Sequence, residues 1–342
     1  MKLYEIEIRP RTSMGTAIKG DTLFGHFCWQ VAYDAKLVEG GLENQLRHYS
    51  QSPFIVFSSA FPKTTGKNPT YFFPRPGAAL LETSVLKDKP RKDRLLERKA
   101  LKDKKWMAVL NLTKISLKNA LYLDDSEIKE RSNETVVATK KSTCETRNTP
   151  EFTLRMSLPH NSINRLSGAT GTGAFAPYIR ESLFFRPGLT LALFVLLDEA
   201  ATDIDRVKKG LKRIGTWGFG KDASIGMGRF DVGLHLELSL PNPEAANACF
   251  SLAPSVPEAE AFSRIFFSPF IRFGKHGDIL ATGRNPFKRP VIMADEGSVF
   301  VRRENTGIMK PFIGQAVTGV SYSNPETVAQ GYAPWLPLQL EL

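Results

Sequence analysis

The stretch that most constrains the fold of this chain runs from Gly215 to Phe230, GTWGFGKDASIGMGRF, and contains five glycines. Glycine serves where a backbone must adopt positive φ or let another molecule come close. A helical pattern precedes the stretch, because apolar residues recur at spacings of three and four over 204–214. A strand pattern follows it over 231–240, where a valine and four leucines alternate with other residues. The sequence therefore predicts a glycine-rich loop that joins the C-terminus of a helix to a strand.

This order argues against a nucleotide-binding P-loop, although the spacing from Gly215 to Gly220 and Lys221 mimics one. A P-loop connects a strand to a helix whose N-terminus faces the phosphates. Here no helix pattern follows, and Asp222 replaces the serine or threonine that would hold magnesium. Two interpretations stay open. The stretch is either a turn that closes a sheet, or a loop that binds a phosphodiester chain through exposed backbone amides and cations such as Lys221 and Arg229.

The charge of the chain favours the binding interpretation. The 342 residues carry a formal net charge of +11 at pH 7, and the sequence pI is about 9.5. A basic balance of this size favours a polyanionic partner, nucleic acid first and an anionic membrane surface second. The alternative is a surface that is basic without a dedicated partner.

The cysteines and the apolar segments indicate in which cellular compartment the protein is found. Cys28, Cys144 and Cys249 lie far apart and form no CxxC pair. We therefore expect reduced thiols in a cytoplasmic protein, with neither a zinc ribbon nor disulfides and with no metal or other cofactor. The N-terminal residues alternate as a strand does, unlike a signal peptide, and the longest apolar run, 189–197, is too short to span a membrane.

The N-terminal region predicts a strand, a loop and a helix. Apolar and charged residues alternate over 3–9, as in a half-buried strand. A loop that contains Lys19 follows, and either Asp21 or Thr22 can cap the next helix. His26 lies in the first turns of that helix, within the apolar sequence GHFCW. A histidine there can act as a general acid or base, but we favour a packed histidine because its neighbours are apolar.

A second block with binding potential spans residues 159–178, PHNSINRLSGATGTGAFAPY. Side chains that donate hydrogen bonds, namely hydroxyls, an amide and the guanidinium of Arg165, lie here among glycines. A hairpin of this composition can lie close to RNA, with hydroxyls and Arg165 reaching phosphate or 2′-hydroxyl groups. The same composition also suits an ordinary hairpin rich in glycine and threonine.

Several motifs together resemble one protein family. They are KGDTLFGHFCW at the first helix, YFFPRPG, the hairpin block, the glycine-rich loop, and NPFKRPV and GYAPWLPLQL toward the C-terminus. Each is similar to a motif of the CRISPR-associated RAMP superfamily. The combination resembles the subunit that caps the 5′ end of CRISPR RNA (crRNA) in type III-A (Csm) effector complexes. His160 and Asn164 stand where the backbone-forming RAMP subunits typically have Arg and Asp, which argues against the target-cleaving subunit.

The resemblance implies an α+β fold of tandem ferredoxin-like (RRM-like) RAMP units, with a glycine-rich loop and an inserted β-hairpin thumb. We expect residues 1–150 to form an N-terminal ferredoxin-like unit with a basic insertion. We expect a thumb-like hairpin and a second ferredoxin-like half, with the glycine-rich loop, over 151–240. A strand-rich C-terminal part over 241–342 would complete the fold.

The resemblance also implies a non-catalytic RNA-binding subunit that serves in antiviral defence. Such a subunit would hold the 5′ repeat-derived handle of crRNA, and would bridge the large palm-domain subunit to the backbone RAMP subunit. Together with the donors and cations of the sequence, this role predicts RNA contacts at Lys19, Ser162, Asn164, Arg165, Thr170, Gly171, Thr172, Gly173, Gly218, Phe219, Gly220, Lys221, Ser224, Gly226, Gly228 and Arg229.

Two other functions stay open. In a metal-independent RAMP endoribonuclease that processes repeat RNA, His26 or His160 would be the general base, and Lys19 or Arg165 would stabilise charge. A basic interaction protein without a fixed RNA preference is the third possibility. The cationic stretch 87–105 is either a solvent-exposed helix or an arm close to RNA or to a neighbouring subunit. The polar sequence up to residue 150 predicts a loop.

Overall fold

The structure is a computed structural model that describes residues 1–66, 68–77, 80, 90–118, 120–128, 153–186, 188–303 and 310–341. The polar segment predicted before residue 150, which includes Cys144, lies outside these ranges, as do residues 87–89 of the cationic stretch. Among the described residues, no helix is both long enough and apolar enough to cross a membrane.

A seven-stranded sheet forms the centre of the molecule, with its strands in the order β10-β1-β9-β2-β3-β4-β6. These strands are β1 (Lys2–Pro10), β2 (Ile55–Lys63), β3 (Tyr71–Pro74), β4 (Trp106–Val109), β6 (Leu121–Leu123), β9 (Thr190–Leu197) and β10 (Phe230–Leu238). Every pair in this sheet is antiparallel.

Four of these strands and two helices form one ferredoxin-like unit. The chain runs β1, α1 (Gly20–Tyr33), β2, and later β9, α6 (Ile204–Trp217), β10, and the four strands are neighbours in the sheet. This is the β-α-β-β-α-β arrangement of a ferredoxin-like fold. The sequence pattern predicted the two halves in successive units, whereas the structure joins them in one. The reason is β9, which is buried along its whole length and therefore requires a neighbouring strand on each side, namely β1 and β2.

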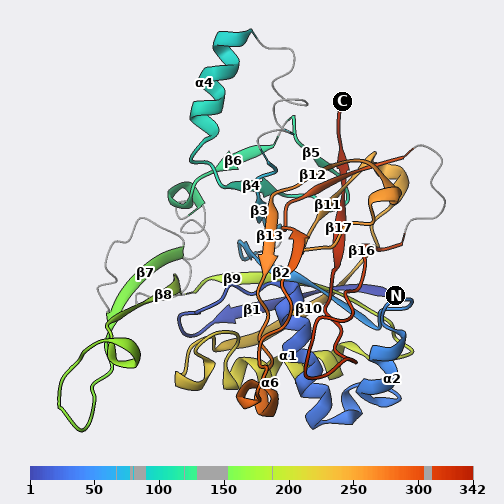
Figure 1. The fold of residues 1–342 in the computed structure, drawn as a ribbon. Coiled ribbons are helices and arrows are strands. Elements are labelled where there is room, and N and C mark those ends of the chain that lie inside the picture. Colours follow the sequence, from blue (N-terminus) through green and yellow to red (C-terminus); the bar gives the residue numbers. More distant parts are fainter. Residues whose placement is uncertain are drawn as a thin grey trace.

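The helices α1 and α6 and the shorter α2 (Gly41–His48) cover one face of this sheet (Figure 1). Where α1 and α6 meet, Gly210 lies so close to the Phe27 ring that a Cβ at position 210 would come within 2.6 Å of it. Asp203 caps α6, because its carboxylate accepts a hydrogen bond of 2.8 Å from the Arg206 amide. For α1 the predicted cap was wrong: the residue before the helix is Lys19, which makes no side-chain cap, and Asp21 pairs with Arg272 instead.

A six-stranded sheet covers the opposite face, in the order β12-β15-β11-β17-β16, with β5 paired to β17. Contacts such as the one between the rings of Phe73 and Phe250, 5.8 Å apart, join the two sheets in one core. The strands predicted in the C-terminal part are therefore present, and they complete this core. The strands are β5 (Ile115–Ser116), β11 (Ala248–Ser251), β12 (Phe262–Phe266), β15 (Val299–Arg302), β16 (Phe312–Gly314) and β17 (Tyr332–Gln339).

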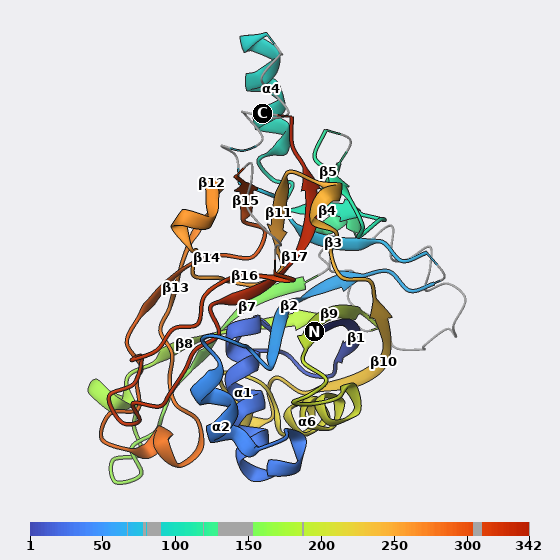
Figure 2. The same ribbon diagram turned by 90° about the vertical axis from the view of Figure 1, so that its right-hand side faces the viewer.

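A hairpin, a helix and a two-stranded ribbon belong neither to the two sheets nor to the helix layer. A hairpin of β7 (Thr153–His160) and β8 (Tyr178–Phe185) projects from one side in Figure 1, and α4 (Arg91–Leu101) rises from the top in Figures 1 and 2. The helix α4 lies within the cationic stretch predicted from the sequence and buries none of its residues. The third element is a two-stranded ribbon of β13 (Pro269–Arg272) and β14 (Val291–Ala294). Short 3₁₀ turns span Ala35–Leu37, Gly173–Phe175, Ala223–Ile225, Pro243–Ala245, Ala259–Ala261 and Asp278–Thr282.

Candidate nucleic-acid interface

The glycine-rich loop, residues 218–229, folds back on itself. The Phe219 amide donates a hydrogen bond of 2.9 Å to the Gly228 carbonyl. Gly218 and Gly228 have φ of 108° and 74°, a region that favours glycine. A Cβ at Gly228 would overlap the Phe219 carbonyl. These buried glycines, and the fully buried Phe219, therefore shape the loop and are not exposed for contact with RNA, which corrects the expectation for residues 218, 219 and 228.

The loop docks on the first loop of the chain, residues 11–19, and we call these two loops together the cradle. The Gly228 amide donates to the Ser13 carbonyl at 2.8 Å. The amides of Lys221 and Arg229 donate to the hydroxyls of Thr16 and Thr12, at 3.1 and 3.0 Å. The amides of residues 218–221 and 225–229, which are most of the expected row, therefore already have acceptors within the protein. The exposed side chains of Lys221, Ser224 and Arg229 are the groups left for a ligand.

The side chain of His26 packs against the glycine-rich loop of the cradle and fixes it in place. Its Nε2 accepts a hydrogen bond of 3.1 Å from the Gly220 amide, and its ring packs against Phe219 at 4.8 Å between centroids. Burial lowers the pKa of His26 to about 4, so the ring is neutral at physiological pH. A neutral imidazole whose acceptor nitrogen is occupied by a backbone amide is a packed, positioning residue. The structure thus favours the packed histidine over the general base.

The hairpin β7–β8 is fixed to both loops of the cradle. Met14 and Leu183 exchange two backbone hydrogen bonds of 2.8 Å each. Farther along β8, the Arg180 guanidinium lies 3.3 Å from the Asp222 carboxylate. Arg180 is two residues from Tyr178, where the strand pairing ends, so the tip of the hairpin begins about 7 Å beyond this contact. The hairpin whose tip contains the block 159–178 therefore contacts the glycine-rich loop through β8.

The hairpin tip, residues 161–177, presents most of its predicted donors to solvent. Ser162, Arg165 and the four residues 170–173 are exposed. Asn164 is more engaged, because its side-chain oxygen accepts a 2.9 Å bond from the Leu166 amide and helps to form the turn. Leu166 is 99% exposed and was not singled out from the sequence.

Lys19 does not belong to the exposed set. Its ammonium pairs with the carboxylates of Asp295 and Glu296, the latter at 2.6 Å, and its side chain is only 14% exposed. These contacts anchor Lys19, and with it the start of α1, to the C-terminal part. The sequence could not predict this, because the partners lie 276 and 277 residues away.

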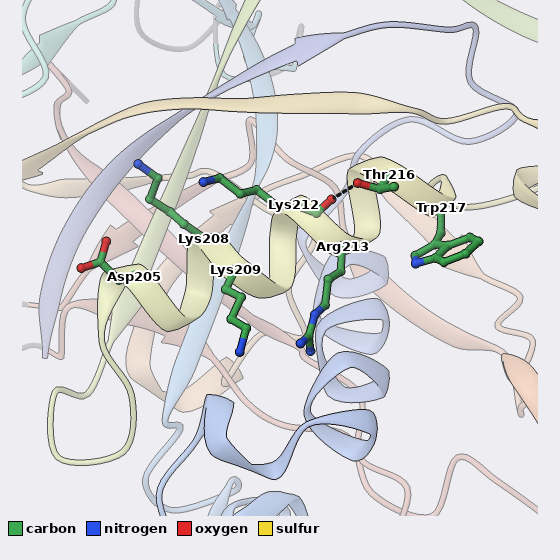
Figure 3. A pocket seen from close by; sticks show the side chains of 7 residues that line it. All are labelled: Asp205, Lys208, Lys209, Lys212, Arg213, Thr216 and Trp217. Atoms are coloured by element: carbon green, nitrogen blue, oxygen red, sulfur yellow. Dashed lines mark hydrogen bonds between the residues drawn. The ribbon is translucent and has the colours of Figure 1, made fainter.

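A cationic groove on the outer face of α6 leads to the cradle, and its lining residues are labelled in Figure 3. Lys209 and Arg213 each bind Asp34 at 2.9 Å, and these hydrogen bonds lower the pKa of Asp34 to about 2. Trp217 ends the groove directly before Gly218 and is 75% exposed. Trp217 follows Ile214 by three residues and so continues the apolar spacing of α6, which offered no sign that the indole would be exposed.

Comparisons with known proteins bear on the fold. No protein-family profile and no curated protein matches the sequence. A chain in the crystal structure of the Csm1-Csm4 cassette in complex with cA4 is similar, with a TM-score of 0.55, 15% identity and complete coverage of both chains. A chain of the Csm3-Csm4 subcomplex of the type III-A CRISPR-Cas interference complex matches with a TM-score of 0.51 and 15% identity, over 98% of this chain and 99% of that one. Csm4 is the component that both complexes share.

This chain shares its fold with chains of the Csm1-Csm4 and Csm3-Csm4 complexes. The resemblance drawn from the sequence motifs is confirmed at the level of the fold, and the expected α+β class is confirmed with it. At 15% identity the likeness does not extend to individual contact residues, so the cradle and hairpin described above are assigned from their own geometry.

Proposed function

We propose that this chain is a non-catalytic subunit of a type III CRISPR effector complex, and that it binds the 5′ repeat-derived handle of crRNA. The observation that carries the proposal is the likeness in fold, over the full length, to chains in Csm1-Csm4 and Csm3-Csm4 complexes. In the proposed assembly the chain lies between a large palm-domain subunit and a backbone RAMP subunit. The second sheet would be the second RAMP unit, and β7–β8 would be the thumb.

The geometry of the cradle supports a role in holding RNA. Lys221 and Arg229 extend from a loop whose backbone is fixed by bonds to residues 12, 13 and 16, so their cations are presented from a rigid support. Hydroxyls and Arg165 stand on the exposed tip of the hairpin that contacts this loop through Arg180. Cations with hydroxyl donors suit a single strand held by its phosphates and 2′-hydroxyls. The net charge of +11 agrees with this partner.

The histidines favour binding over cleavage. Acid–base catalysis on RNA requires a group that exchanges protons near neutral pH at an accessible atom. His26 is neutral and its Nε2 accepts from the Gly220 amide. His160 stacks on Tyr178, with 5.6 Å between ring centroids, and its Nε2 is buried. Neither arrangement presents a general base beside the exposed cations.

The RNA that co-purifies with the full-length protein tests the proposal. We expect small RNAs that share one 5′ end of repeat sequence when the protein is isolated from cells that hold its own CRISPR array. The double variant Lys221→Gln, Arg229→Gln should lose most of this RNA. The control variant Arg47→Gln, Lys114→Gln removes the same charge from exposed sites outside the cradle and should keep the RNA. RNA of random sequence, or equal retention by both variants, would refute the assignment.

A further inference from the structure

The ribbon β13–β14 is longer than its two named strands, and it forms an arm that descends beside α1 (Figure 2). The strands pair from Pro269 with Ala294 to Arg272 with Val291. Beyond them, the Lys288 amide donates to Gly274 and the His276 amide to Pro286, both at 2.8 Å. The arm, residues 269–276 and 286–294, is therefore a two-stranded hairpin with two distinct faces.

The inner face of the arm is fastened to α1 by polar contacts. Arg272 binds both oxygens of Asp21, with Nη2 to Oδ1 at 2.9 Å. The Phe270 ring lies between the Lys19 ammonium, at 4.4 Å, and the Arg272 guanidinium, at 4.7 Å. His276 bonds to Ser321 at 2.7 Å. These contacts fix the arm, so the opposite face is directed outward.

The outer face carries exposed aromatic side chains next to cations. Phe273 is 73% exposed, Phe287 is 65% exposed, and Tyr322, which flanks the arm, is 64% exposed. The Lys275 ammonium lies over Phe287 at 5.8 Å, and the Arg289 guanidinium lies over Tyr322 at 4.5 Å. Phe287 pairs with Lys275 across the arm, and Phe273 precedes Lys275 by two residues, so these two rings share one face and indicate a binding surface.

The charges around this face distinguish between possible partners. Of two nearby acids, Asp21 is paired with Arg272, and Asp278 accepts from the Tyr33 hydroxyl on the side of the arm that faces α1. The outer face therefore keeps the positive charge of Lys275 and Arg289. Aromatic residues and Arg are common to protein interfaces and to surfaces for single-stranded nucleic acid, whereas lysine is depleted at the centres of protein interfaces. The Lys275 ammonium beside the exposed Phe287 ring therefore favours nucleic acid.

The position of the arm connects it to the cradle. The turn of the arm rests on α1, where Trp29 lies against Gly277 and Tyr33 binds Asp278. His26, which holds the glycine-rich loop, precedes Tyr33 by seven residues on the same helix, or about 10 Å along its axis. One single strand can therefore reach from the cradle to the arm.

We infer that the outer face of this arm is a second RNA-binding surface, on which bases of a single strand stack on Phe273, Phe287 and Tyr322. Lys275 and Arg289 hold the adjoining phosphates. The inference rests on the proposed function for the nature of the ligand. It adds a site that binds bases by stacking, whereas the cradle binds phosphates through its cations. Because every base has a π-face, the platform tolerates any sequence.

Binding of a fluorescein-labelled 20-nucleotide oligouridine to the full-length protein tests the inference. The variant Phe273→Ala, Phe287→Ala should weaken binding by at least about fivefold for each ring that stacks on a base. Its salt dependence should stay that of the wild type, because no phosphate contact is removed. The variant Lys275→Gln, Arg289→Gln should instead reduce the salt dependence. Both changes are on exposed side chains, so melting temperatures should stay close to that of the wild type.

The cradle variant Lys221→Gln, Arg229→Gln, measured in parallel, separates this inference from the proposed function. If the cradle variant loses affinity and the ring variant keeps it, the platform is refuted and the proposed function stands. If neither loses affinity, both fail. Photo-crosslinking with 4-thiouridine RNA gives an independent result, since the platform predicts adducts at Phe273, Phe287 or Tyr322. Loss of binding to a protein subunit, without loss of RNA affinity, would assign the face to a protein partner and overturn the inference.

Discussion

Replacing His26 by glutamine should remove a large part of the acid sensitivity of this protein. Burial lowers the pKa of His26 from 6.5 to about 4 in the folded chain. The unfolded chain therefore binds more protons than the folded one between these values, and the folded state loses stability as pH falls through this window. Above pH 6.5 the contribution is fully present, and it amounts to about 3 kcal/mol at about 1.4 kcal/mol per pKa unit.

The comparison is made by urea unfolding at pH 7.5 and pH 5.0, followed by tryptophan fluorescence. Between these two pH values the wild type should lose about 2 kcal/mol through His26 alone. In His26→Gln this part of the loss should vanish, while the glutamine oxygen can still accept from the Gly220 amide. In His26→Ala that amide loses its acceptor, and stability at pH 7.5 should fall by about 1–3 kcal/mol.

Two controls complete the design. His48→Gln, at the exposed end of α2, should leave the pH dependence of the wild type unchanged. An NMR titration of His26 should show no protonation above about pH 5. If His26→Gln keeps the full pH dependence, or if His26 titrates near 6.5, the ring does not hold the glycine-rich loop in its neutral form and the argument for a packed histidine fails.

Further substitutions test the cradle and its surroundings. Gly228→Ala should lower the free energy of unfolding more than Gly226→Ala, because a Cβ at 228 overlaps the Phe219 carbonyl while one at 226 meets no described atom within 4 Å; equal losses in urea unfolding would contradict this. Burial raises the pKa of Glu296 to about 7, so its contribution to stability is present below pH 4.5 and is lost as pH rises to 7. Glu296→Gln should flatten this decline in melting temperature, and a decline equal to that of the wild type would refute the assignment. Trp217→Ala should weaken RNA binding by about fivefold in fluorescence anisotropy without changing the melting temperature, if the exposed indole stacks on a base.

Helices and strands with a strong periodicity of apolar residues were predictable from the sequence. The strand at 3–9, the helix from 204 and the glycine-rich loop after it all occur where the pattern indicated. The periodicity of apolar residues in a segment shows which of its faces is buried, and this is all that one segment predicts by itself. The partners of a strand are not recorded locally. The buried strand β9 gave no sign that β1 and β2 would lie on its two sides and close one ferredoxin-like unit.

The regions that form the candidate site were predictable from the sequence, but fewer of its individual residues were. The hairpin and the glycine-rich loop were selected for their composition, and the Arg180–Asp222 pair brings them together. Lys19 and Phe219 were selected with them but point inward, since burial and pairing depend on residues far away in the sequence. The arm at 269–294 was not selected, although its exposed aromatic and basic residues were visible, because alternation alone does not tell which face is outward.

The salt dependence of RNA binding tests the central claim most directly, namely that the cradle holds a single strand through Lys221 and Arg229. Affinity for a single-stranded RNA of repeat sequence is measured over a series of salt concentrations for the wild type and for Lys221→Gln, Arg229→Gln. Loss of two phosphate contacts should weaken binding and reduce the slope of log K against log salt concentration by about 1.4. The charge-matched Arg47→Gln, Lys114→Gln should keep the slope of the wild type. An unchanged slope in the cradle variant would show that these cations do not contact the RNA.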